Sequence, residues 1–170
     1  MKLVVDLSSD SLADAEDKLR KYAAYIKAKA QELCERLSFL GAAEVTAGFS
    51  QAIYDGEQDV DIKVRRVTEK GKIAYRIVAS GQTVLFLEFG AGVRYGYGHP
   101  LDADFGMGPG TYPKGKGHWN DPKGWWFKDA TGKKYHSYGN PPIMAMYNTS
   151  QELHRIVEDV AREVFASDRP

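Results

Sequence analysis

The sequence predicts an α+β fold, in which a long N-terminal helix and a C-terminal helix pack on an antiparallel sheet of about four strands. Apolar residues recur every three or four positions near both ends of the chain, as they do on one face of a helix. Between these two segments, apolar and polar residues alternate, which is typical of strands with one buried face. The helices are the expected cover for that face. With 170 residues, the chain has the length of about one domain, so we interpret residues 1–170 as a single domain.

The first predicted helix covers residues 11–39. Its apolar stripe consists of Leu12, Ala15, Leu19, Tyr22, Ile26, Ala30, Leu33 and Leu37. Ser11 is expected to cap the start of this helix, and Gly41 is expected to end it. A helix of this length extends about 43 Å, so it is either a long core helix or one whose end packs on another subunit. Cys34, within this helix, is expected to be a small buried residue.

Four strands are predicted after the first helix, over residues 44–54, 59–65, 72–78 and 83–89. In the second and third, apolar residues alternate with polar ones, and Glu69-Lys70-Gly71 between them is typical of a hairpin turn. The fourth contains a run of four apolar residues, which favours a strand buried on both faces.

The second predicted helix covers residues 150–166, where apolar residues again follow the helical period. Thr149 and Glu152 match a capping box at its start, and Asn148 with Gln151 is an alternative one residue earlier. The apolar residues expected to anchor the chain just before this helix are Ile143, Met144 and Met146.

Residues 90–124 are expected to form a long inserted loop. Ten of these 35 residues are Gly and four are Pro, a composition that excludes an ordinary helix or a central strand. Disordered segments are usually poor in aromatic residues, so the aromatic side chains here favour a loop that becomes ordered. It would order against the body of the domain, a neighbouring copy or another partner. The candidate interface residues in and after this loop are Tyr95, Tyr97, Tyr112, Trp119, Trp125 and Trp126.

The sequence shows no phosphate-binding loop, dinucleotide fingerprint or nucleophile elbow. The candidate ligands of a zinc-dependent hydrolase site are His99, His118, His136, Asp102, Asp104 and Asp121. The spacing of the three histidines matches no zinc signature, so we expect no catalytic residues, no metal and no cofactor. Cys34 is the only cysteine, which excludes an internal disulfide. Because no apolar run is long enough to span a bilayer, we expect a soluble protein made in the cytoplasm.

Charge is balanced, with 23 Lys and Arg against 23 Asp and Glu, which is unlike the basic footprint of a nucleic-acid-binding domain. Residues 112–134 are a local exception, because lysines and aromatic residues mixed in this way can track phosphates and stack bases. The residues concerned are Lys114, Lys116, Lys123, Lys128, Lys133, Lys134, Tyr112, Trp119, Trp125 and Trp126. A nucleic-acid-binding module is therefore the alternative function. A hairpin that begins at Trp125 and turns at Gly132 explains the same pattern without a ligand.

Residues 86–93, with the sequence Phe-Leu-Glu-Phe-Gly-Ala-Gly-Val, resemble a segment of the tail-completion or neck proteins of long-tailed bacteriophages. In prophages, these proteins are often described as head–tail joining or minor tail proteins. Ala91 stands where that family usually has Thr. Residues 124–127, 133–139 and 142–153 resemble later segments of the same family, in the same order along the chain.

This resemblance implies a structural protein of the virion that sits at the head–tail junction or at the head-proximal end of the tail. Such proteins form rings of identical subunits, such as hexamers, and carry no catalytic residues. The implied partners are connector or stopper, tail terminator or tail tube proteins. DNA would only pass through the lumen of the ring, and no membrane is involved. The protein would be made in the host cytoplasm, from a phage or a prophage.

Within the resembling segment, Glu88, Phe89, Gly90 and Gly92 are expected to form a structural turn. Phe89 should be buried, and Gly90 or Gly92 should have a positive φ, which Gly adopts without penalty. Glu88 is an acid in an apolar segment, so it should either face solvent or pair with an arginine such as Arg94.

Overall fold

The computed structural model of the chain describes residues 8–54, 58–95, 98–107, 121–129 and 131–166. The elements in chain order are α1 (Ser9–Ser50), β1 (Asp61–Glu69), β2 (Lys72–Ser80), α2 (Val84–Phe89), β3 (Trp125–Lys128), β4 (Lys134–Ser137) and α3 (Ala145–Ala166). Strands β1 and β2 form one antiparallel pair, and β3 and β4 form another. The α+β class is confirmed, but the single sheet of about four strands is wrong, because the described strands form two separate hairpins.

The first helix is longer than the sequence predicts, and it begins and ends elsewhere. Its N-cap is Ser8 rather than Ser11, with the Ser8 hydroxyl accepting the Ser11 N–H at 3.3 Å. It continues through Gly41 to Ser50, so a strand over residues 44–54 is also wrong. Val45 and Phe49 explain the extension, because these two residues lie one helical turn apart and are both buried in the core.

Gly41 lies where α1 contacts two other elements most closely. A Cβ atom at this position would be 2.6 Å from Cδ1 of Ile77 in β2 and 2.8 Å from Cδ1 of Leu153 in α3. Glycine inside a helix costs roughly 1 kcal/mol relative to alanine. Gly41 permits β2 and α3 to pack closely against α1, and it does not act as the C-cap that the sequence predicts.

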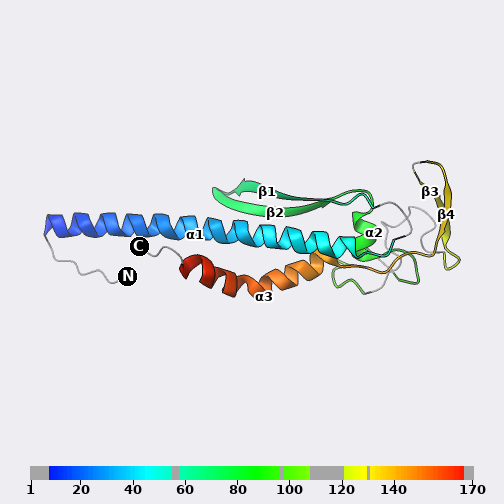
Figure 1. The fold of residues 1–170 in the computed structure, drawn as a ribbon. Coiled ribbons are helices and arrows are strands. Elements are labelled where there is room, and N and C mark those ends of the chain that lie inside the picture. Colours follow the sequence, from blue (N-terminus) through cyan, green and yellow to red (C-terminus); the bar gives the residue numbers. More distant parts are fainter. Residues whose placement is uncertain (1–7, 55–57, 96–97, 108–120, 130, 167–170) are drawn as a thin grey trace.

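Helix α1 forms the axis of the molecule (Figure 1). Helix α3 runs antiparallel to it along one side of its C-terminal half, and the β1–β2 hairpin lies along another side. Near the end of α3, the Tyr25 hydroxyl donates a hydrogen bond to the Phe165 carbonyl at 3.1 Å. Residues 9–28, the N-terminal part of α1, reach the end of α3 at Tyr25 and extend past both elements before it (Figure 1). We call this segment the arm.

The core lies where α1, α2 and the start of α3 meet, around Val45, Phe49, Leu87 and Ala145. Residues 84–89 form a short helix, so the predicted strand over residues 83–89 is wrong. A run of four apolar residues is compatible with a helix or with a strand. In this helix, Leu87 is fully buried and Leu85 is exposed.

Helix α3 begins at Ala145, five residues before the predicted start. Thr149 is therefore a buried residue inside the helix, and the predicted capping boxes are wrong. Of the three residues predicted as anchors, Ile143, Met144 and Met146, the role is confirmed for Ile143 and Met146, which pack against the core.

Both hairpins are confirmed. In the first, Glu69 pairs with Lys72, and the connecting Lys70 and Gly71 have φ values of 48° and 75°. Two successive residues with positive φ form the tight turn that suits a two-residue hairpin.

The second hairpin pairs Trp125 with Ser137 and Phe127 with Tyr135. Gly132, in the loop that joins its strands, has a φ of 85°. The Asp129 carboxylate stabilises this loop by accepting the backbone N–H groups of Thr131 and Lys133.

Candidate functional site

The segment that carries the resemblance lies where three distant parts of the chain meet. These are α2, the described loop residues 98–107, and the approach to α3 over residues 140–147. The turn after α2 behaves as predicted in two respects. Phe89 is buried, and Gly90 and Gly92 have φ values of 78° and 79°.

Gly90 and Gly92 are required by close contacts as well as by their backbone conformation. A Cβ atom at Gly90 would lie 2.8 Å from the Pro142 nitrogen, and one at Gly92 would lie 2.5 Å from the Tyr138 carbonyl oxygen. The chain therefore turns sharply here against the segment that leads into α3.

Glu88 is the central side chain of this junction. It is buried, with 5% of its surface exposed, and it contacts no arginine in the described structure, so the prediction for this residue is wrong. Its Oε2 accepts the Met146 N–H at 2.9 Å, and its Oε1 accepts the Tyr147 N–H at 2.9 Å. The carboxylate thus satisfies two of the unpaired N–H groups in the first turn of α3, where negative charge is also favoured.

Arg94, the expected partner of Glu88, lies elsewhere. Its guanidinium carbon is 4.3 Å from the centre of the Tyr138 ring, in a cation–π contact. The sequence could not show this, because the donors to Glu88 are backbone groups 58 and 59 residues away.

His99 completes the environment of Glu88. Its Nε2 lies 3.3 Å from Oε1 of Glu88, and its Nδ1 accepts the Leu101 N–H at 3.1 Å. Because Nδ1 accepts a hydrogen bond, the proton of the neutral ring is assigned to Nε2, which donates it to Glu88. Phe89 packs against the His99 ring, with the ring centres 4.1 Å apart.

The main chain around α2 is tied to the approach to α3 by further hydrogen bonds. The Asn140 side chain donates to the Phe86 carbonyl at 2.8 Å, and the Ile143 N–H donates to the Leu87 carbonyl at 2.8 Å. Ala91 and Asn140 exchange two backbone hydrogen bonds. The carbonyls at the end of α2, which have no partner within that helix, thus accept hydrogen bonds from residues 140–143. Glu88 in turn accepts the N–H groups at the start of α3.

A cavity of about 520 Å³ adjoins Glu88 and His99. Its other lining residues are largely apolar and include Val84, Phe105 and Met146. Both carboxylate oxygens and both ring nitrogens already have protein partners. These hydrogen bonds join α2, the loop and α3, although Oε2 of Glu88, with one hydrogen bond, keeps the capacity to accept another.

The candidate interface residues lie in different surroundings. Tyr95 is exposed, Trp125 is half-buried, and Trp126 is 68% exposed on the β3–β4 hairpin. The remaining candidates, Tyr97, Tyr112 and Trp119, lie outside the described residues. Part of the long loop does order against the body, since His99 is buried at the Glu88 junction.

The zinc-site hypothesis receives no support from the described residues. His99 is engaged by Glu88, His136 packs on Trp126, and His118 lies outside the described ranges. Within the part of the chain that is described, no three His, Cys, Asp or Glu side chains gather in a way that would hold a metal ion.

Sequence reasoning missed two features of this site. It considered His99 only as a candidate metal ligand and not as a partner of Glu88, and it did not single out Asn140. The Asn140-Pro141-Pro142 sequence ahead of a helix is the signal that could have identified a fixed turn there.

Cys34 is exposed rather than buried, so that prediction is wrong. It lines an apolar groove between β2 and α3. Among the described residues, neither long helix has an apolar stretch sufficient to cross a membrane.

Comparison with models of known families, with curated proteins and with solved structures found no match to this chain.

Proposed function

We propose that this chain is a structural protein of a long-tailed bacteriophage virion, located at the head–tail junction or at the head-proximal end of the tail. It acts there by assembling into a ring of identical subunits and by protein–protein contacts, without a catalytic role. The resemblance of residues 86–93 to tail-completion and neck proteins suggests the class.

The observation that carries the proposal is the arm. It is a helical segment that extends beyond the β1–β2 hairpin and the end of α3 (Figure 1), and it carries exposed apolar side chains on either side of the buried Ala15. Leu12 and Leu19 are 49% and 55% exposed, and Tyr22 and Ile26 are each 38% exposed. Exposed apolar residues aligned on one face of a helix are typical of a surface that binds another protein.

The Glu88 junction also supports a structural role. In an enzyme, a buried carboxylate beside a histidine would need an oxygen or a nitrogen directed at a substrate. Here the carboxylate holds the first turn of α3, and the histidine holds a loop turn. The segment that carries the resemblance therefore serves to hold the first turn of α3 against α2.

The partners that fit this proposal are further copies of the chain, together with connector or stopper, tail terminator or tail tube proteins. DNA passes through the lumen without specific recognition. The chain is made in the host cytoplasm, from a phage or a prophage genome, and ends in the neck or tail of the particle.

The location can be tested on purified phage particles from the strain that encodes this chain. Mass spectrometry should find the protein in a fixed ratio to the tail tube protein, and gold-labelled antibody should mark the head–tail junction. Portal, capsid and tail-tube genes beside the coding sequence are expected as well. Absence of the protein from particles that are otherwise complete would overturn the proposal.

Nucleic-acid binding is the second candidate, and one observation favours it. The β3–β4 hairpin exposes Trp126, and Lys128 and Lys134 line the same shallow pocket as this tryptophan. An exposed aromatic ring beside lysines is suited to stacking on an unpaired base. If this is the function, binding of a labelled single-stranded oligonucleotide should weaken steeply with salt and should be lost in Trp126→Ala. If the neck proposal is right, wild-type protein and Trp126→Ala should both bind weakly and equally.

A further inference from the structure

One edge of strand β2 has no partner strand within the described ranges. β1 pairs with the other edge, and Glu69 and Lys72 form the last pair before the two-residue turn. The last pair of such a hairpin exchanges hydrogen bonds, and the next pair points its N–H and C=O groups outward. The outward groups of β2 therefore belong to Ile73, Tyr75, Ile77 and Ala79. We call these groups the β2 edge. Among the described residues, they form no backbone hydrogen bond.

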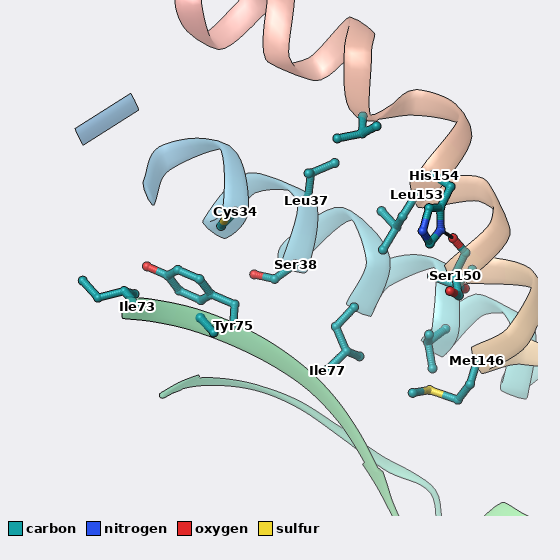
Figure 2. A pocket seen from close by; sticks show the side chains of 14 residues that line it. Cys34, Leu37, Ser38, Ile73, Tyr75, Ile77, Met146, Ser150, Leu153 and His154 are labelled. Atoms are coloured by element: carbon teal, nitrogen blue, oxygen red, sulfur yellow. Dashed lines mark hydrogen bonds between the residues drawn. The ribbon is translucent and has the colours of Figure 1, made fainter. Parts of the chain in front are cut away.

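The β2 edge borders an apolar groove. This groove, of about 550 Å³, lies between β2 and α3, with α1 as its floor. Figure 2 shows Tyr75 and Ile77 of β2 on one side of the space and Leu153 of α3 on another. Ile77 and Met146 also line the cavity of about 520 Å³, so the groove continues along β2 as far as Ala79.

An extended segment suits this surface better than a helix does. A helix pairs its own backbone groups, so it would leave the β2 edge without partners. An added strand would pair with that edge and place alternate side chains in the groove, which is a common mode of peptide recognition. From Ile73 to Ala79, the edge is about 20 Å long at the rise of a strand. It therefore accommodates about six residues.

Residues 2–7, with the sequence Lys-Leu-Val-Val-Asp-Leu, have the composition of such a strand. Apolar residues occupy every second position from Leu3 to Leu7, as in a strand with one buried face. The other segments outside the described residues are less suitable. Residues 108–120 contain four Gly and two Pro, which disfavour a paired strand, and the remaining segments have four residues or fewer.

Residues 2–7 cannot reach the groove of their own chain. They precede α1, and the groove residue of α1 that lies closest to its start is Cys34. Cys34 is about 38 Å from Ser9 at the helical rise, whereas six residues span at most about 22 Å. The arm thus keeps this segment away from the β2 edge of the same molecule, and another copy must receive it.

We propose that residues 2–7 of one copy add as a strand to the β2 edge of a second copy, with Leu3, Val5 and Leu7 directed into the groove. The arm is then the spacer between the two bodies. Because the donated segment and the receiving edge are different parts of the chain, the contact is head-to-tail and extends to a third copy. The inference deepens the proposed function by naming the subunit contact, and it rests on that proposal for the closure of the ring.

A synthetic peptide of residues 1–8 tests the strand directly. The receptor is the full chain with Val4→Pro and Val5→Pro, so that its own segment does not compete. Proline lacks the N–H, and one of two successive residues faces the edge in either strand direction. A peptide with the same two prolines is the control, and it should bind at least about fivefold more weakly.

Hydrogen exchange measured by NMR shows where the peptide pairs. A saturating amount of the unsubstituted peptide should slow exchange at the four amides of the β2 edge by at least about tenfold. The outward amide of Val64, on the opposite edge of the hairpin, should be unchanged. A helix in the groove would leave all of these amides unprotected.

Two substitutions at Tyr75 separate strand addition from other uses of the groove. Tyr75→Pro and Tyr75→Val both remove the ring, but only proline removes the outward N–H. Proline is tolerated at an open edge, so both variants should fold, which circular dichroism verifies. In the receptor, Tyr75→Pro should bind the peptide at least about fivefold more weakly than Tyr75→Val, because a backbone hydrogen bond is lost. If Tyr75→Pro does not fold, hydrogen exchange of the β2 edge decides the question.

Sedimentation tests whether the strand comes from a second copy. At concentrations above the Kd of the peptide, the wild-type chain should form larger species than the double-proline variant. Equal sedimentation would overturn the inference, and so would a peptide that does not bind. Equal binding by the two Tyr75 variants, or protection at Val64 instead of the β2 edge, would overturn it as well. Absence of the protein from phage particles would instead overturn the proposed function, and would leave a measured contact between copies standing.

Discussion

Removal of the Glu88 carboxylate should detach the first turn of α3 from α2 and destabilise the whole fold. Glu88 accepts two backbone N–H groups of α3, each at 2.9 Å, and faces His99 at 3.3 Å. In Glu88→Ala, these donors lose their acceptor in a junction that has little access to water. In Glu88→Gln, one oxygen remains to accept, but the amide nitrogen faces the other N–H group.

The expected magnitude follows from the number of hydrogen bonds lost. A hydrogen bond to a charged group contributes roughly 1.5–3 kcal/mol. Loss of the two bonds to α3 in Glu88→Ala should therefore lower the free energy of unfolding by about 3–6 kcal/mol, and loss of one in Glu88→Gln by about 1.5–3 kcal/mol. Both effects are large against the total stability of about 5–15 kcal/mol that is usual for a domain.

Urea denaturation followed by circular dichroism at 222 nm measures these differences. Glu44→Gln is the matched control, because Glu44 is an exposed acid on α1, and this variant should stay within about 0.5 kcal/mol of the wild type. If Glu88→Gln were as stable as the control, the structural role assigned to Glu88 would be wrong. A Glu88→Gln variant that folds normally but no longer assembles would make Glu88 an interface residue.

Three further predictions concern the turns and the surface. Gly90→Ala should destabilise the protein more than Gly71→Ala, as measured by urea denaturation. Both positions have positive φ, but a Cβ atom would meet the backbone of Pro142 and Asn140 at Gly90 and nothing within 4 Å at Gly71; equal losses would contradict this reasoning. Hydrogen bonds from the Thr83 hydroxyl and from the Gln82 and Thr83 N–H groups hold the pKa of Asp59 below its usual value. The charged Asp59 therefore stabilises the fold fully above the pKa of about 3.9 that it has in the unfolded chain, and this stabilisation is lost as the pH falls through its lower pKa in the folded protein. On acidification below about pH 5, the free energy of unfolding should decrease less in Asp59→Asn than in the wild type. Parallel curves of stability against pH for the two proteins would refute this. Trp126→Ala should leave the melting temperature nearly unchanged, because this side chain is 68% exposed, and a large decrease would show that it is packed in the fold.

The features that the sequence predicts correctly are determined by neighbouring residues. The first hairpin follows from alternation on both sides of Lys70-Gly71, and the second from the aromatic residues before Gly132. The buried Phe89 and the positive φ of Gly90 follow from an apolar segment that ends in glycine. In each case, the information lies within about ten residues of the feature.

The features that the sequence predicts wrongly depend on distant contacts. The continuation of α1 through Gly41 is favoured by close packing of Ile77 and Leu153, which are 36 and 112 residues away. The helical form of residues 84–89 is fixed by hydrogen bonds from Asn140 and Ile143. No local pattern could have revealed that Glu88 caps a helix that begins at Ala145.

We propose that the protein acts at the head–tail junction or the head-proximal end of the tail, and electron microscopy of a mutant phage tests this proposal most directly. A stop codon early in the gene should produce lysates with filled heads and separate tails but without joined particles. A plasmid that supplies the wild-type protein should restore joined, infectious particles. Joined and infectious particles in the absence of the protein would contradict the account.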